Sequence, residues 1–305
     1  MPDPALSARG VVKSYDGKKA IDGVTFEASR GELLAVLGAR GAGKTTLLSL
    51  LKGDLLPDSG RMTVGGLDPS DRGNSAELRR RVGWMGQSVC GFPRLTVQEN
   101  ISFFSEMAGY GPDSSLLEGA GLSSLAGSRY SRLTPAERKR VGLALAFSGS
   151  PETVLLDEPT AGLDAEARPG VWAAVKGLSR GKTTLVATSS CDEAVSLGAR
   201  ICVMVRGVIV AADTPANLVA SFGKGKAVVF KDGGETAFGT LRRFFEGVAM
   251  DGRDVLLPFE NIRDLEVALR ELVGRGVQPD ITMEVPSLKS VLMTLMGGSS
   301  EGSEA

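Results

Sequence analysis

The sequence predicts an α/β protein built around a largely parallel sheet, and two observations carry this prediction. Short apolar runs at residues 32–37 (ELLAVL), 153–157 (TVLLD) and 183–188 (TTLVAT) have the length and apolar character of buried strands. Stretches with helical patterns separate these runs along the chain, and parallel strands need crossovers of this kind. The 305 residues are enough for one large domain and a small second one.

Turn residues and helical patterns predict the other elements of the first domain. A glycine-rich turn follows the first strand, and KTTLLSLLKG after it is a helical pattern that ends at Gly53. Residues 200–210 predict a strand, a turn at Arg206 and Gly207, and another strand. Residues 88–150 are helical in pattern and rich in glycine and serine, so we interpret them as a helical insertion.

A second unit is predicted after about residue 221, where Gly223 and Gly225 mark a break. KAVVFK and DVLLPF predict strands, and we expect helices near Thr240 to Phe245 and at LEVALRELVGRG. The predicted domains are therefore residues 1–221 and a small C-terminal α/β module at residues 222–298. The last residues, 299–305, are of low complexity and predict a disordered tail.

The composition argues against several classes of protein. Lys and Arg number 35 against 36 Asp and Glu, so no basic excess marks a nucleic-acid binder, and we expect no nucleic-acid partner. No apolar run is long enough to span a membrane, and the N-terminus lacks the pattern of a secretory signal. Cys90, Cys191 and Cys202 have no metal-ligand spacing, which favours reduced thiols in a cytosolic protein.

Residues 38–46 (GARGAGKTT) match the phosphate-binding pattern G-x-x-x-x-G-K-[ST]. Gly38, Gly41 and Gly43 let the backbone turn tightly and point its N–H groups inward. Lys44 can reach the outer phosphates, and the Thr45 hydroxyl can bind magnesium. A glycine-rich turn that matches by chance is the alternative, but the strand before it and the helix after it are the context that the motif requires.

The strand end VLLDE at residues 154–158 supplies the carboxylates that a phosphate-binding loop needs. Asp157 can hold the magnesium ion through water. Glu158 can orient or deprotonate an attacking water molecule. Taken alone, this stretch could equally be an acidic strand end on a surface. Its occurrence together with the phosphate loop favours the catalytic interpretation.

Over residues 6 to about 221 the sequence resembles the ATPase subunits of ATP-binding cassette (ABC) transporters. GARGAGKTT is similar to the Walker A loop, TVLLDEP to Walker B with its catalytic glutamate, TAGLD to the D-loop and WMGQ to the Q-loop. KSYDGKKAIDGVTF places Tyr15 where the family stacks an aromatic ring on adenine, although Tyr15 alone is typical of a plain strand residue. GFPRLTVQENISFF and VMVRGVIVAADTPANL resemble the segment after the Q-loop and the closing hairpin. The resemblance implies a P-loop NTPase cassette with a mostly parallel sheet and a helical insertion.

The resemblance also implies the cofactors, ATP and Mg²⁺, and the residues that contact them. The catalytic positions are Glu158, Gln87 and Ser189, the last at the H-loop position. The implied metal contacts are Thr45, Gln87 and Asp157. The implied nucleotide contacts are Tyr15, Gly38, Ala39, Gly41, Ala42, Gly43, Lys44, Thr45, Thr46 and Asp164, joined from the opposite subunit by Thr134, Ala136 and Glu137.

The stretch LTPAE at residues 133–137 departs from the family signature LSGGQ, which closes over the ATP of the opposite subunit. Thr134, Pro135 and Glu137 predict a capping box at a helix start. Thr134 keeps a hydroxyl and Ala136 an N–H group, but Pro135 has no N–H group, and Glu137 brings an anion close to the γ-phosphate.

A second departure concerns Ser189, which stands where the family usually has a histidine; the chain contains no histidine. The loss of one preorganised donor typically costs about 10²–10³ in rate. We therefore expect slow hydrolysis, the alternative being that another side chain or a water molecule compensates.

The resemblance implies a subunit that powers a membrane transporter, and the small C-terminal module favours an exporter with separate subunits. Multi-span permease subunits would dock near the Q-loop and the helical insertion, at the cytoplasmic face of the cell membrane. A homodimer, or a heterodimer with a homologous subunit, would enclose two ATP molecules. PSLKSVLMTLMG at residues 286–297 resembles the helix that ends such modules, or is plain core.

Two other classes of function stay open at this point. The first is a non-catalytic or regulatory nucleotide-binding subunit, which LTPAE and Ser189 favour and Glu158 disfavours. The second is a soluble cassette protein that acts on ribosomes or DNA, which the single cassette and the neutral charge disfavour.

Overall fold

The structure, a computed structural model, describes residues 3–88, 91–222, 226–251, 253–259, 262–277, 280–284 and 288–297. The chain divides into two compact units, Met1–Pro215 with Leu295–Ala305, and Ala216–Thr294. The boundary predicted at residue 221 lies further along, within α8 (Pro215–Phe222). Cys90, the predicted break at Gly223 and Gly225, and the predicted tail at residues 299–305 lie outside the described residues.

A six-stranded, largely parallel sheet forms the centre of the first unit, with the strand order β5-β6-β7-β3-β8-β9. The five parallel strands are β3 (Leu33–Leu37), β5 (Val82–Met85), β6 (Thr153–Asp157), β7 (Thr183–Thr188) and β8 (Arg200–Val205). The edge strand β9 (Val208–Asp213) runs antiparallel to β8. The α/β class and the predicted strands are confirmed, because continuous apolar runs are what a sheet covered on both faces requires.

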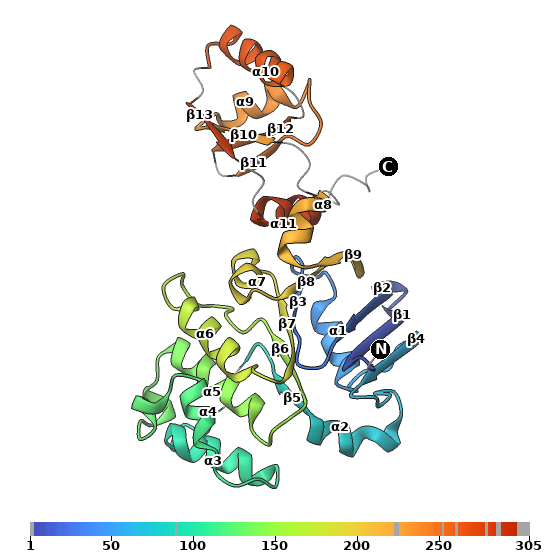
Figure 1. Cartoon of the computed structure of the whole chain (residues 1–305), viewed down its shortest axis with the longest axis vertical. Coiled ribbons are helices and arrows are strands. Elements are labelled where there is room, and N and C mark those ends of the chain that lie inside the picture. Colours follow the sequence, from blue (N-terminus) through green and yellow to red (C-terminus); the bar gives the residue numbers. More distant parts are fainter. Residues whose placement is uncertain are drawn as a thin grey trace. The chain divides into compact units, whose positions relative to one another are not determined.

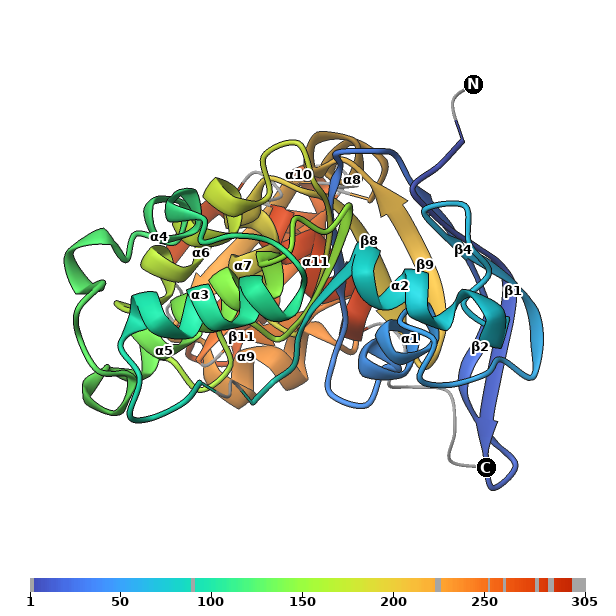
Figure 2. The same cartoon turned by 90° about the horizontal axis from the view of Figure 1, so that it is seen from below.

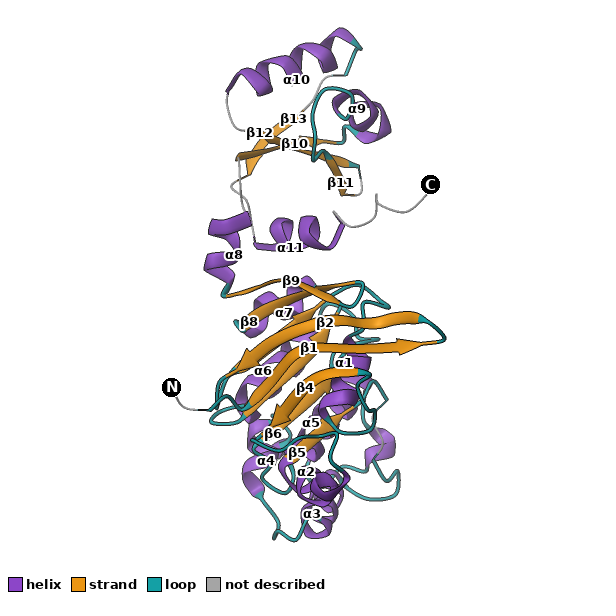
Figure 3. Ribbon diagram, turned by 90° about the vertical axis from the view of Figure 1, so that its right-hand side faces the viewer, coloured by secondary structure: helices purple, strands orange, loops and turns teal. Residues whose placement is uncertain are grey.

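A three-stranded antiparallel sheet forms a second layer, with the order β2-β1-β4 (Figure 3). Its strands are β1 (Leu6–Tyr15), β2 (Lys18–Ala28) and β4 (Ser59–Val64). Helix α1 (Lys44–Leu51) lies between the two sheets (Figure 1). One buried cluster joins the three layers, and it includes Leu6, Val24, Leu47, Leu51, Leu155 and Leu185. This packing holds the start of α1 rigidly at the end of β3.

Helices cover the other face of the six-stranded sheet, and Figure 2 shows them together on the side away from β1, β2 and β4. They are α3 (Val97–Met107), α4 (Ser114–Gly119), α5 (Pro135–Phe147), α6 (Arg168–Leu178) and α7 (Cys191–Leu197), while α2 (Ser75–Arg81) precedes β5. Helix α5 approaches β5 so closely that a Cβ atom on Gly83 would lie 1.9 Å from the Ala146 carbonyl oxygen. Among the described residues between 91 and 150, the regular elements are helical only.

The second unit is a four-stranded antiparallel sheet with the order β11-β12-β10-β13. Its strands are β10 (Lys226–Lys231), β11 (Ala249–Asp251), β12 (Asp254–Phe259) and β13 (Asp280–Glu284), and its helices are α9 (Gly234–Leu241) and α10 (Ile262–Gly274). Val228, Phe230, Leu257 and Leu272 belong to its buried core. The helix predicted near residues 240–245 is wrong in position, because α9 ends at Leu241. Helix α11 (Leu288–Gly297) crosses the division between the units.

Two further findings concern the environment of the chain. In the part of the chain that the structure describes, no helix is both long and apolar enough to cross a membrane. Cys191 and Cys202 are buried and free of disulfide bonds. Burial raises the pKa of the Cys202 thiol to about 12, so this thiol is protonated and unreactive at neutral pH.

Candidate functional site

The predicted site residues follow the carboxyl ends of four parallel strands. Gly38 follows β3, Gln87 comes two residues after β5, Glu158 follows β6, and Ser189 follows β7. Because parallel strands end at one edge of a sheet, these residues are gathered there although they are far apart in the sequence. This edge is the usual place for a ligand in an open α/β sheet.

The phosphate loop has the geometry of an anion cradle. Gly41 and Gly43 have φ angles of 77° and 105°, which side chains with a Cβ atom rarely adopt. Gly38 is needed for a different reason, since a Cβ atom there would lie 2.3 Å from the Met204 carbonyl oxygen. Lys44 Nζ donates to the carbonyl oxygens of Gly38 and Ala39, at 2.8 and 3.1 Å. In the described structure no side chain caps the N-terminus of α1, so its positive end is open to a phosphate.

Asp157 and the two side chains that donate to it form a mixed donor set. Thr45 Oγ1 donates to Asp157 Oδ2 at 2.9 Å, and Gln87 Nε2 donates to the same oxygen at 3.3 Å. Asp157 Oδ1 is buried and has no hydrogen-bond partner among the described residues. Burial raises the pKa of the Asp157 carboxyl, and the hydrogen bonds from Thr45 and Gln87 lower it in part. A carboxylate, a hydroxyl and an amide at one point, with one carboxylate oxygen unpartnered, fit a hard cation such as Mg²⁺.

Glu158 links the cradle to the end of β7. Its Oε1 lies 3.2 Å from Lys44 Nζ, and its Oε2 accepts hydrogen bonds from Ser189 N and Ser189 Oγ, both at 3.1 Å. Its φ angle of 50° is uncommon for a residue with a side chain and marks local strain, which concentrates at functional sites. Ser189 therefore holds the carboxylate of Glu158, the residue predicted from the sequence to be the catalytic base.

The start of α5 confirms the predicted capping box. Glu137 N donates to Thr134 Oγ1 at 3.3 Å, and Thr134 N donates to Glu137 Oε2 at 2.7 Å. Pro135 has no N–H group, and Arg138 N donates to the Thr134 carbonyl oxygen. From Thr134 to Arg138, all N–H groups except that of Ala136 are thus taken or missing.

The other predicted nucleotide contacts do not join this cluster within the described chain. Tyr15, at the end of β1, is 45% exposed and has Lys13 Nζ 5.9 Å from its ring centroid. Asp164 accepts a hydrogen bond from Ala167 N inside its own loop. Within the described chain, Thr134, Ala136 and Glu137 form no hydrogen bond or ion pair with Lys44 or Glu158.

Sequence reasoning missed two buried charged residues beside the site. Lys139, 9% exposed on α5, donates through Nζ to the Gln87 carbonyl oxygen at 2.8 Å. Glu193, 1% exposed on α7, accepts hydrogen bonds from Thr160 Oγ1 at 2.8 Å and Trp172 Nε1 at 3.2 Å. Burial raises the pKa of Glu193. No sequence signal marks either residue, because a charged residue on a helix is typical of a solvated face.

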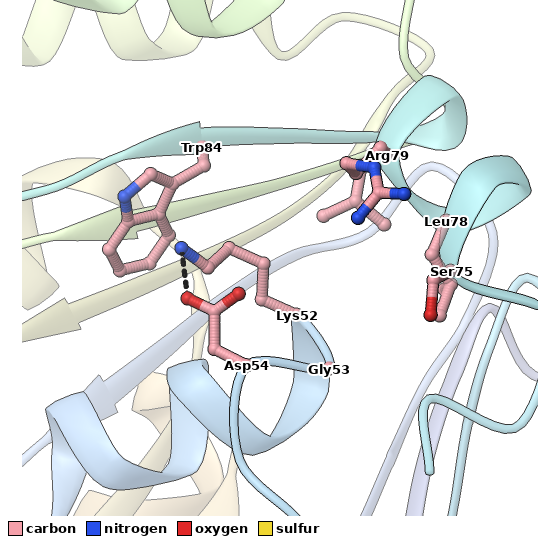
Figure 4. A pocket seen from close by; sticks show the side chains of 8 residues that line it. Lys52, Gly53, Asp54, Ser75, Leu78, Arg79 and Trp84 are labelled. Atoms are coloured by element: carbon pink, nitrogen blue, oxygen red, sulfur yellow. Dashed lines mark ion pairs between the residues drawn. The ribbon is translucent and has the colours of Figure 1, made fainter. Parts of the chain in front are cut away.

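A pocket of about 250 Å³ lies beside β5, on the strand that leads to Gln87 (Figure 4). Lys52 Nζ lies 4.5 Å from the centroid of the Trp84 ring and forms an ion pair with Asp54. The complete lining is Lys52, Gly53, Asp54, Ser75, Leu78, Arg79, Val82 and Trp84. No pattern in the sequence indicates this pocket.

A phosphate cradle, an adjacent carboxylate with a hydroxyl ligand, and an acidic side chain at one sheet edge define a P-loop nucleoside-triphosphatase. The sequence profile described as "ABC transporter" matches residues 21–161. The chain is 38% identical over 228 residues to "Nod factor export ATP-binding protein I" of Paraburkholderia xenovorans, which covers 72% of this chain and 74% of that protein. It is 32% identical to "Daunorubicin resistance ATP-binding protein DrrA3" of Streptomyces coeruleorubidus, over 100% of both chains.

Solved structures show the same fold. The dimeric ATP-binding cassette MJ0796, bound to ADP and Pi, superposes with a TM-score of 0.59 at 24% identity and covers 68% of this chain and 98% of that one. The cbiO1 subunit from Clostridium perfringens, part of the ABC transporter complex cbiONQ, gives a TM-score of 0.62 at 25% identity, over 72% and 92%. The chain belongs to the ABC transporter family; it is an ATP-binding subunit of a membrane transporter and an ATPase.

Proposed function

We propose that this subunit powers an exporter by slow hydrolysis of magnesium-bound ATP, enclosed between two cassettes. Relatives named for Nod factor export and for daunorubicin resistance support the export direction. The observation that carries the proposal is the meeting of two pairs at one sheet edge: Thr45 hydrogen-bonds to Asp157 at 2.9 Å, and Lys44 Nζ lies 3.2 Å from Glu158 Oε1.

The residues of this chain bind the nucleotide and provide the catalytic base. Lys44 and the open N-terminus of α1 bind the β- and γ-phosphates, and Tyr15 stacks on the adenine ring. Glu158 accepts a proton from the water whose oxygen attacks the γ-phosphorus, while the bond from this phosphorus to the β–γ bridging oxygen breaks and ADP leaves. Ser189 orients Glu158 through its two hydrogen bonds. Phosphate binding at Lys44 therefore replaces the Glu158 ion pair and frees this carboxylate for the water.

Thr45, Gln87 and Asp157 are the residues that we propose to hold Mg²⁺. The unpartnered and buried Asp157 Oδ1 supports this assignment. When bound, the metal neutralises charge on the phosphate oxygens. The amide of Gln87 has an oxygen to offer a cation besides the nitrogen that now donates to Asp157. Magnesium loading is thus expected to loosen the hydrogen bond between Gln87 and Asp157.

The opposite wall of the site comes from the second cassette, and it explains the slow rate. Thr134, Ala136 and Glu137 face the γ-phosphate of the partner's nucleotide with one free N–H group and one carboxylate. On this chain's own side of the site, Ser189 stands where the family uses an imidazole, and its single hydroxyl hydrogen is donated to Glu158. Both changes lower the number of donors on the γ-phosphate, and each lost donor costs about 10²–10³ in rate.

We propose that permease subunits dock near the Q-loop and the helical insertion, at the cytoplasmic surface of the membrane. Phe92 and Phe103 are 45% and 41% exposed and pack edge to face with centroids 5.1 Å apart. Buried Asn100 fixes this loop, since its Oδ1 accepts from Phe92 N at 2.7 Å. The pocket of Figure 4 and this aromatic pair lie on either side of Gln87 in the sequence, and we propose that a partner bound to them acts on the Q-loop.

Two substitutions test the proposed roles in the assembly with its membrane partner. Lys44→Ala is expected to remove most of the ATP affinity, because it deletes the cation of the cradle. Glu158→Gln is expected to abolish phosphate release while ATP still binds, because the amide cannot accept the proton. ATP titration and steady-state phosphate release measure the two effects. Unchanged ATP binding by Lys44→Ala would show that the cradle is misassigned.

A further inference from the structure

Lys139 occupies an unusual place for a lysine. It follows the capped start of α5, yet it is 9% exposed, and its ammonium group reaches the backbone of the Q-loop. Its Nζ donates to the Gln87 carbonyl oxygen at 2.8 Å. Within the described chain no carboxylate oxygen lies within 4 Å of this nitrogen, so the carbonyl is its nearest polar contact. Burying a lysine is costly and requires a compensating interaction.

The elements that carry Lys139 and Gln87 are packed together. Gly83 on β5 has no room for a Cβ atom because the Ala146 carbonyl oxygen on α5 is so close. The carboxylates of Glu193, Asp157 and Glu158 act on Lys139 through space. Lys139 therefore links α5 to the Q-loop, within electrostatic reach of the acidic end of β6. A movement of α5 relative to the Q-loop acts on the hydrogen bond to Gln87.

We propose that Lys139 is a positioning residue that holds Gln87 in place for the metal and couples α5 to the Q-loop. This inference rests on the proposed role of Gln87 as a magnesium contact. The hydrogen bond at the Gln87 carbonyl fixes the backbone from which the amide side chain reaches Asp157 at 3.3 Å. When α5 docks on the partner's nucleotide, its motion reaches the metal site through this bond.

The direction in which a Lys139 substitution changes the Mg²⁺ affinity distinguishes positioning from a simple charge effect. Lys139 is a cation near Asp157, so deleting its charge alone would make the site more negative and strengthen Mg²⁺ binding. Deleting a group that positions a metal ligand instead weakens Mg²⁺ binding, by about 10-fold or more. Lys139→Met removes the charge and the donor together and keeps most of the length of the side chain. Weaker Mg²⁺ binding by this variant therefore identifies positioning.

The experiment is a calorimetric titration of the full-length protein with a non-hydrolysable ATP analogue, at a series of Mg²⁺ concentrations and in EDTA. For Lys139→Met we expect unchanged affinity in EDTA and about 10-fold loss of the Mg²⁺-dependent gain. Lys139→Arg keeps a donor and is expected to recover most of the gain. Hydrogen exchange of the amides at residues 86–88 should become faster in Lys139→Met and not in Lys139→Arg.

Two controls make the result specific. Arg140, the next residue on α5, also donates to a backbone carbonyl, that of Gly121 at 2.8 Å, but on the surface. Arg140→Gln is expected to leave Mg²⁺ binding unchanged. In a Gln87→Ala background, Lys139→Met should cause no further change in Mg²⁺ affinity.

The outcomes separate the inference from the proposed function. Stronger or unchanged Mg²⁺ binding by Lys139→Met overturns the positioning role, even if the wild type binds magnesium and ATP as proposed. A folding defect in Lys139→Met leaves Lys139→Gln and Lys139→Arg to decide by the same two readouts. A wild type whose affinity does not depend on Mg²⁺ overturns the metal site itself, and the inference with it.

Discussion

Glu137→Gln removes one negative charge from the start of α5 and keeps the hydrogen bonds that define it. In the structure, Glu137 Oε2 accepts from Thr134 N at 2.7 Å, and Glu137 N donates to Thr134 Oγ1. Glutamine is also accepted at this position of a capping box, because its amide oxygen serves the same N–H group. The substitution therefore tests the charge at the proposed phosphate contact and leaves the helix start intact.

The size of the effect follows from the charge and from the remaining donors. Of Thr134, Pro135, Ala136 and Glu137, Ala136 alone has an uncommitted N–H group, so little offsets the repulsion between Glu137 and a phosphate. Two like charges about 4 Å apart repel by about 1 kcal/mol in water and about 4 kcal/mol at a protein surface. Taking the low end of this range, about 1 kcal/mol, since the site is open before closure, removal of the charge raises the rate about 5-fold.

The assay is steady-state phosphate release by the assembly with its membrane partner. Glu99→Gln is a matched control, because Thr96 and Glu99 form the same capping box at the start of α3, with Thr96 N donating to Glu99 Oε2 at 2.7 Å. We expect the rate to rise for Glu137→Gln and to stay constant for Glu99→Gln. Equal rates for both variants and the wild type would show that Glu137 does not face the partner's phosphate.

Three further predictions follow from other parts of the chain. Residues 1–221 expressed alone should fold and bind ATP, as thermal unfolding and titration can check; an insoluble or nucleotide-blind product contradicts separate domains. Burial raises the folded pKa of Glu193, so its contribution to stability is present below the ordinary glutamate pKa and is lost as pH rises through the raised value. The melting temperature of Glu193→Gln relative to wild type should therefore increase from acid to neutral pH, and a constant difference would be contrary evidence. Pro135→Gly, Ala136→Gly and Glu137→Gln combined with Ser189→His should raise phosphate release well above Glu137→Gln alone; a fast wild type that these changes leave unaltered would show that LTPAE and Ser189 are tolerated variation.

The parts of the structure that the sequence predicted are those with a strong local pattern. The strands β3, β6 and β7 are continuous apolar runs, and Gly41 and Gly43 occupy φ angles that other residues avoid. The capping box of α5 was predictable because each of its members contacts the others within one helical turn. In these cases the physical cause lies within a few residues of the chain.

The missed features depend on contacts between distant segments. Lys139 is buried where its side chain reaches the Q-loop backbone, and Glu193 is buried where Thr160 and Trp172 converge on it from other elements. In the second unit, β11 has three residues and is too short for a periodic signal. The position of α9 was misjudged because its sequence, GETAFGTL, contains two glycines, which disfavour a helix.

In the proposed dimer, Ser189 and the LTPAE stretch of one chain contribute to two different nucleotide sites. Their separate effects on the rate therefore indicate which kind of dimer forms. Ser189 bonds to Glu158, so it acts on the nucleotide bound by its own chain. Among the described residues, Thr134 and Glu137 at the start of α5 form no hydrogen bond or ion pair with that cluster, and in the proposed dimer they act on the nucleotide of the other chain. In a homodimer both defects meet in each site, and restoring one leaves every site impaired. In a heterodimer with a complete partner, Ser189→His completes one site, and the LTPAE substitutions complete the other. Near-full recovery of one site by a single set of changes therefore indicates a heterodimer, whereas recovery that needs both sets indicates two copies of this chain.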